Sequence, residues 1–140
     1  MEEHKDFGDV VELILKEDGR FDKGAYYFVR QGLDHTIRNL DKSPKEELPR
    51  HVTGRELLEG IRDFAHDQYG PLAYTLLDHW GITKCDDFGD IVFNLVDYGV
   101  LGKTENDKKE DFSGGYDFRE AFLKPYLPKN AKGELHPEQS

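Results

Sequence analysis

The sequence has one cysteine, no long apolar run and fewer basic than acidic residues. The lone Cys85 excludes an internal disulfide and is typical of a reducing compartment. No apolar run approaches the ~18 residues that a membrane-spanning helix needs. Residues 1–5 have neither the basic nor the apolar region of a secretory signal. The sequence therefore predicts a cytoplasmic protein without a membrane segment.

Basic residues are scarce throughout the chain. Nineteen Lys and Arg stand against 29 Asp and Glu, which gives a net charge of −10. Residues 53–100 alone hold three basic and nine acidic residues. Such a surface repels phosphate backbones and attracts cationic partners. A surface that merely keeps the protein soluble has the same composition, so charge alone leaves both interpretations open.

Hydrophobic periodicity predicts a mainly α-helical domain over residues 1–124, with a flexible tail over 125–140. Helices are expected at 6–17 and 22–39, followed by a polar connector at 41–52 with two prolines. Gly32 lies inside the second helix, where a close helix crossing would explain it. Thr53 and Glu56 have the spacing of a capping box at the start of the next helix.

Three helices after residue 53, followed by a hairpin, are the order of a winged helix-turn-helix. Gly70-Pro71 and Gly81 separate the helices, Asp86 or Asp87 is expected to cap the third, and Gly99 ends it. Strands at 100–103 and 114–118 would form the wing. A terminal helix over 117–123 is the alternative. The predicted fold is two N-terminal helices packed on a winged-helix-like three-helix unit with a short β-hairpin.

The third helix of this unit would read DNA, but it is acidic. Its predicted outward residues are Asp87, Asp90, Asn94 and Asp97, of which only Asn94 suits a base edge. Four carboxylates against one lysine over 84–98 make binding to nucleic acid an unlikely function. These four residues are instead the predicted docking site for a protein with a basic surface.

Other constellations are weaker. A DNA-binding regulator would need a basic patch assembled in space, from Arg20, Arg30, Arg38, Lys42, Lys45 and Arg50. Asp63, His66 and Asp67 share one helical turn, yet they match no complete metal motif. Cys85 lies near a helix N-terminus, where two aspartates oppose a thiolate. Three aromatic residues fall off the apolar stripes and form either a partner or dimer patch or part of the core: Tyr27, Tyr74 and Phe93.

Three segments also carry a family resemblance. Residues 52–61, 87–96 and 20–29 resemble a bacterial protein family of planctomycetes and verrucomicrobia, over about residues 7–122. Lys23-Gly24 departs from the pattern of that family. The resemblance implies one domain and a bacterial, cytoplasmic origin, and it brings no activity with it.

Together these observations predict a non-enzymatic, cytoplasmic protein-interaction module with no cofactor and no metal. Its partner would be a protein with a basic surface or a second copy of the chain. A DNA-binding transcription regulator is the alternative, and a small metal-dependent hydrolase is the third hypothesis.

Overall fold

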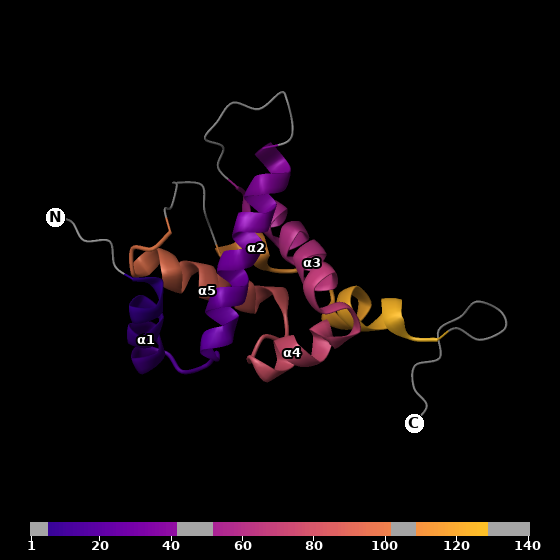
Figure 1. The fold of residues 1–140 in the computed structure, drawn as a ribbon, viewed down its shortest axis with the longest axis horizontal. Coiled ribbons are helices and arrows are strands. Elements are labelled where there is room, and N and C mark those ends of the chain that lie inside the picture. The colour runs from indigo at the N-terminus through magenta and orange to yellow at the C-terminus, as the bar shows by residue number, and fades with distance from the viewer. Residues whose placement is uncertain (1–5, 42–51, 102–108, 129–140) are drawn as a thin grey trace.

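The computed structural model describes residues 6–41, 52–101 and 109–128, and the regular elements among them are helices, with no strand (Figure 1). Four elements are short helical turns, labelled η. In chain order the elements are α1 (Phe7–Glu17), α2 (Lys23–Asp41), α3 (Gly54–Tyr69), η1 (Gly70–Leu72), α4 (Ala73–His79), α5 (Cys85–Asp97), η2 (Lys109–Phe112), η3 (Arg119–Leu123) and η4 (Lys124–Tyr126).

The five α-helices form where the apolar periodicity places them. Thr53 and Glu56 make the predicted capping box: the Glu56 amide donates to the Thr53 hydroxyl at 3.1 Å, and the Thr53 amide donates to the Glu56 carboxylate at 3.0 Å. Gly70 and Gly99 follow α3 and α5 with positive φ of 50° and 82°, a conformation that glycine adopts without strain. α5 begins at Cys85, earlier than a cap at Asp86 or Asp87 implies, but the Asp87 side chain does cap the helix by accepting from the Lys84 amide.

α2 and α3 cross closely at small residues. A Cβ added to Gly60 would overlap the Thr36 hydroxyl and lie 2.8 Å from the Thr36 Cβ atom. A Cβ on Gly32 would lie 2.9 Å from Ile61 Cγ1. Glycine therefore lets the two backbones approach, which confirms the crossing expected at Gly32.

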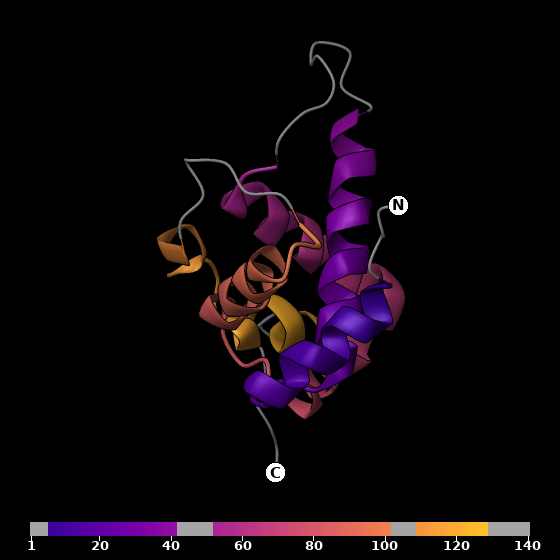
Figure 2. The same ribbon diagram turned by 90° about the vertical axis from the view of Figure 1, so that its left-hand side faces the viewer.

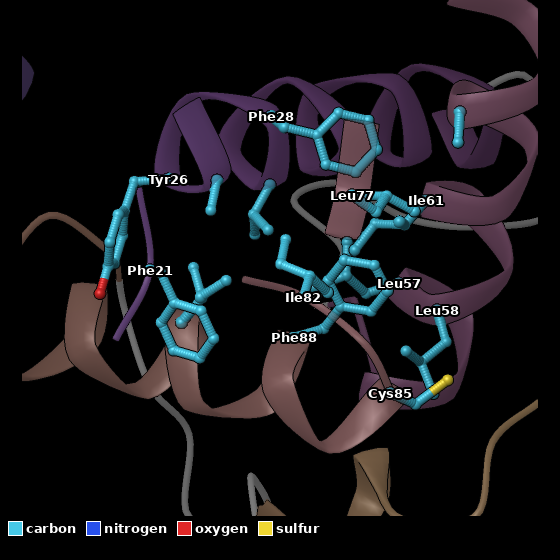
Figure 3. Packing of buried hydrophobic residues seen from close by; sticks show 14 of the residues in the cluster. Phe21, Tyr26, Phe28, Leu57, Leu58, Ile61, Leu77, Ile82, Cys85 and Phe88 are labelled. Carbon is cyan, nitrogen blue, oxygen red and sulfur yellow. The ribbon is translucent and has the colours of Figure 1, made fainter. Parts of the chain in front are cut away.

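The core lies between α2 on one side and α3, α4 and α5 on the other (Figure 3). Phe28 of α2 is at its centre and packs against four other rings, with centroid distances from 5.5 to 6.5 Å: Phe64, Tyr69, Trp80 and Phe88. α1 packs beside α2 in both ribbon views and buries Val10, Val11 and Ile14 (Figures 1 and 2). Burial of the Phe28 ring and of these α1 side chains removes apolar area from water and so stabilises the domain.

The predicted β-hairpin is wrong over the described residues, and the terminal-helix alternative is closer. Residues 115–117 are irregular and 119–126 form the helical turns η3 and η4. A second strand is not possible at Tyr116, since its amide and carbonyl both bond the Cys85 thiol at 3.4 Å. Residues 102–108, in the expected wing, lie outside the described residues, as do the connector at 42–51 and the tail from 129.

Candidate functional site

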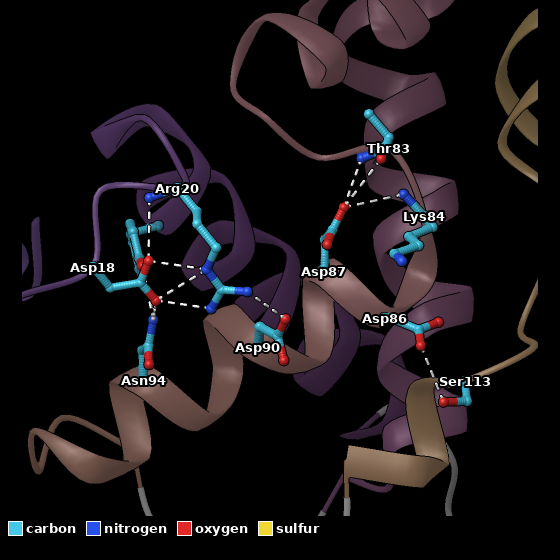
Figure 4. Close-up of polar contacts among 10 residues, drawn as sticks. Asp18, Arg20, Thr83, Lys84, Asp86, Asp87, Asp90, Asn94 and Ser113 are labelled. Carbon is cyan, nitrogen blue, oxygen red and sulfur yellow. Dashed lines mark hydrogen bonds and ion pairs between the residues drawn. The ribbon is translucent and has the colours of Figure 1, made fainter.

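The helix expected to be the docking face, α5, carries a polar network that joins it to the α1–α2 loop (Figure 4). Arg20 Nη2 lies 2.8 Å from Asp18 Oδ2, and Arg20 Nη1 lies 3.0 Å from Asp90 Oδ2. The Asn94 amide donates to Asp18 at 3.2 Å and to the Tyr26 hydroxyl at 3.0 Å. One arginine therefore bridges Asp18, two residues before it, and Asp90, 70 residues after it.

The network shifts the pKa values of its charged members in the directions expected for paired charges. Hydrogen bonds from Arg20 hold the pKa of Asp18 well below its usual range, and Asp18 in turn raises the pKa of Arg20. Burial raises the pKa of the Tyr26 hydroxyl. The cluster is an ion-pair network in which one guanidinium contacts two carboxylates of the same chain.

Asp87, the second predicted docking residue, is only 9% exposed. Its carboxylate accepts from the Thr83 amide at 2.9 Å, the Thr83 hydroxyl at 3.3 Å and the Lys84 amide at 3.3 Å. It therefore satisfies backbone donors at the start of α5. A negative charge at this position also interacts favourably with the positive end of the helix dipole.

The four predicted docking residues thus divide. Asp87, Asp90 and Asn94 contact other residues of this chain, and their role in docking a partner stays a prediction. Asp97, at the end of α5, is exposed as predicted. Periodicity carried no information about the α1–α2 loop, which contacts Asp90 and Asn94.

The opposite flank of α5 is covered as well. A Cβ on Gly89 would lie 3.0 Å from the Phe112 side chain of η2, and the Ser113 hydroxyl donates to Asp86 at 3.2 Å. A recognition helix needs a free face to enter a DNA groove. Because the α1–α2 loop and η2 both pack on α5, this geometry gives no support to the DNA-binding alternative.

The basic patch considered for that alternative is also partly engaged. Arg20 is in the ion-pair network, and the Arg30 guanidinium lies 4.5 Å from the centre of the Phe7 ring. Arg38 is exposed. The other three members, Lys42, Lys45 and Arg50, lie outside the described residues.

The histidine and carboxylate groups on α3 do not converge on a common point. His66 packs against the rings of Phe122 and Tyr126, at 5.6 and 5.5 Å, and its Nδ1 hydrogen-bonds the Tyr126 hydroxyl. His35 packs on Phe64 at 5.4 Å. Over the described ranges, no three His, Cys, Asp or Glu side chains are grouped as metal ligands.

Cys85 fixes the path of the C-terminal segment. It is buried, and burial raises the pKa of its thiol, which disfavours the nucleophilic thiolate. The neighbouring Tyr116 donates its hydroxyl to the Leu58 carbonyl at 2.8 Å and lies under the Arg62 guanidinium. Sequence reasoning missed this anchoring, although the four-residue spacing of Phe118, Phe122 and Tyr126 signals one helical face.

The large exposed apolar side chains lie outside α5. In the described part of the chain, five large apolar side chains are exposed, and Leu72 is the most exposed at 67%. Tyr27, predicted as a patch residue, is among them, whereas Tyr74 and Phe93 are half-buried and pack against the core. The other exposed members are Leu13, Ile37 and Tyr126.

No protein-family model, curated protein or solved structure matches this chain. Membership of the bacterial family therefore stays a prediction. Among the described residues, every helix is too short or too polar to cross a membrane.

Proposed function

We propose that this chain is a non-enzymatic, cytoplasmic protein-interaction module that binds a partner with a basic surface. The observation that carries the proposal is the 67% exposure of Leu72, on a short turn held between two helices. A large apolar side chain that water surrounds is stabilised when a partner covers it, because its apolar area is then removed from water.

The charges support a cationic partner. A net charge of −10 on a chain of this size attracts basic surfaces and speeds their association. A second copy of the chain has the same charge, so a homodimer would bring two acidic surfaces together. A basic protein is therefore a better partner than a second copy or a nucleic acid.

The proposed docking site differs from the one expected on α5. Three of the four residues predicted there are used by the chain itself, and only Asp97 remains as an exposed carboxylate. The polar groups that sequence reasoning considered for chemistry have structural partners too: Cys85 contacts Tyr116, and His66 contacts Tyr126. These contacts support a binding role over a catalytic one.

The test is affinity capture by the full chain from cells that produce it naturally, with wild type, Leu72→Ser and Leu13→Ser compared side by side. Leu13 is a matched control because it is also exposed, at 44%, and lies on α1. We expect a basic protein to be captured by wild type and Leu13→Ser and lost with Leu72→Ser.

Two results would contradict the proposal. One is the capture of no protein by any of the three variants. The other is salt-sensitive binding of mixed genomic DNA fragments in fluorescence anisotropy at low ionic strength, where electrostatic attraction is strongest. The latter result would favour the DNA-binding regulator.

A further inference from the structure

Two exposed apolar side chains lie at the C-terminal end of α3. Leu72 is in η1, which follows α3 directly, and Tyr126 is in η4, where it contacts His66 of α3. Figure 1 shows η3 and η4, in yellow, beside the end of α3 and the start of α4, and α4 contacts η3. The remaining exposed large apolar residues are on α1 and α2: Leu13, Tyr27 and Ile37.

The Tyr126 ring is held in place before any partner arrives. Its hydroxyl hydrogen-bonds His66, and the segment that carries it is anchored by the bond from Tyr116 to the Leu58 carbonyl. The ring is nevertheless 39% exposed. A fixed, half-exposed aromatic loses little conformational entropy on binding, which favours its use as an anchor.

Two carboxylates in the C-terminal half of α3 are unfavourably placed for the helix itself. Asp63 and Asp67 are both exposed on α3 and lie four residues apart, where like charges repel. Asp67 is also in the last turn, where the helix dipole disfavours a negative charge. A cation bound at this position would relieve both effects.

Two other acids, one on α3 and one on η3, pair with basic side chains of the chain. Glu59 pairs with Arg62, and Glu120 pairs with Lys124 at 2.6 Å. The contact shown for Asp67 is the Gln68 amide, at 3.5 Å, which is the limit of a hydrogen bond. Asp63 and Asp67 are therefore exposed carboxylates that a cationic side chain of another molecule can pair with.

We propose that Leu72, Tyr126, Asp63 and Asp67, here called the α3-end surface, bind one basic amphipathic helix of a partner protein. Apolar side chains of that helix cover Leu72 and Tyr126, while its Lys or Arg residues pair with the two aspartates. This inference rests on the proposed function and names its surface and its partner class. Phosphate groups would be repelled by the same carboxylates, which argues against a nucleic acid or an anionic membrane.

The probe is a fluorescein-labelled peptide of ~18 leucine and lysine residues with the apolar positions at helical spacing. Its anisotropy is measured with the full chain at low and physiological salt. A second peptide has glutamate in place of lysine. We expect the lysine peptide to bind and the glutamate peptide not to bind. Equal binding of both peptides would overturn the inference.

Two pairs of variants locate the binding. Leu72→Ser should weaken affinity about tenfold, as truncation of a central interface side chain does, whereas Leu13→Ser should leave it near wild type. The double variant Asp63→Asn/Asp67→Asn should weaken binding and reduce its salt dependence. Its charge-matched control is Asp9→Asn/Asp97→Asn, on α1 and α5. Equal effects within either pair would mean general attraction to an acidic protein and would overturn the inference.

Carbodiimide cross-linking then identifies the carboxylates in contact, since it joins a carboxylate to a lysine amine without a spacer. Mass spectrometry should find the peptide on Asp63 or Asp67, and a distribution over all exposed acids would contradict the α3-end surface. The two proposals fail differently. If Leu72→Ser abolishes capture of the partner but Asp63→Asn/Asp67→Asn does not, the proposed interaction module stands and the proposal of a basic helix as its ligand fails.

Discussion

Gly60→Ala tests the α2–α3 crossing, on which the core depends. Alanine is the better helix former by about 1 kcal/mol, so a helix considered alone would gain stability. In this fold the added Cβ overlaps the Thr36 hydroxyl and lies 2.8 and 3.0 Å from Thr36 Cβ and Cγ2. A rotamer change moves the hydroxyl and the methyl group but not Cβ, so the two helices have to separate.

The expected magnitude follows from these opposing terms. Overpacking of a close contact costs up to about 3 kcal/mol, and the helix propensity returns about 1 kcal/mol. We expect the free energy of unfolding to fall by about 2 kcal/mol, which lowers Tm by about 8 °C in a domain of about 100 ordered residues. Urea unfolding followed by circular dichroism and by the fluorescence of Trp80 measures both quantities.

The controls separate the steric clash with Thr36 from the general effect of replacing a glycine by alanine. Gly19 is exposed, and a Cβ added there would approach the Leu15 carbonyl only to 3.9 Å. The Gly19→Ala substitution should therefore change the free energy of unfolding by less than ~0.5 kcal/mol. Thr36→Ala removes two of the three close atoms and should recover part of the loss in a double-mutant cycle. A Gly60→Ala protein as stable as wild type would refute the close crossing.

Three further predictions concern polar groups. The pKa of Asp18 is lower in the folded state than in the unfolded chain, so its contribution to the free energy of unfolding is present above about pH 4 and is lost as the pH falls further. In the Asp18→Asn variant, the urea midpoint should therefore fall less steeply below pH 4 than in wild type. A pH profile identical to that of wild type would contradict the network. Asp87→Ala should cost about 1 kcal/mol through the lost cap, whereas Asp97→Ala should stay within ~0.5 kcal/mol, as urea unfolding can show. Cys85, buried and with a raised pKa, should react slowly with Ellman's reagent in native protein and rapidly in urea; equal rates would exclude the buried thiol.

Some of the candidate site was predictable and some was not. The aspartates of α5 were expected off the apolar stripe, and Asp97 is exposed as predicted. Asp90 and Asn94 instead meet Arg20 and Asp18, whose positions are 70 and 76 residues away in the sequence. Helical periodicity says which face of a helix is polar, but not whether that face meets water or another polar segment.

The amino-acid sequence by itself determined the helices, because their signals are local. Apolar spacing, the Thr53 capping box and the glycines after α3 and α5 act within a few residues of the backbone they shape. Only the tertiary structure decided that residues 115–126 form irregular and helical segments in place of a strand. The reason is that Tyr116 satisfies its backbone groups with Cys85, 31 residues away, and its side chain fits under Arg62. Long-range contacts of this kind leave no periodic signal in the chain, so they appear only once the helices are packed together.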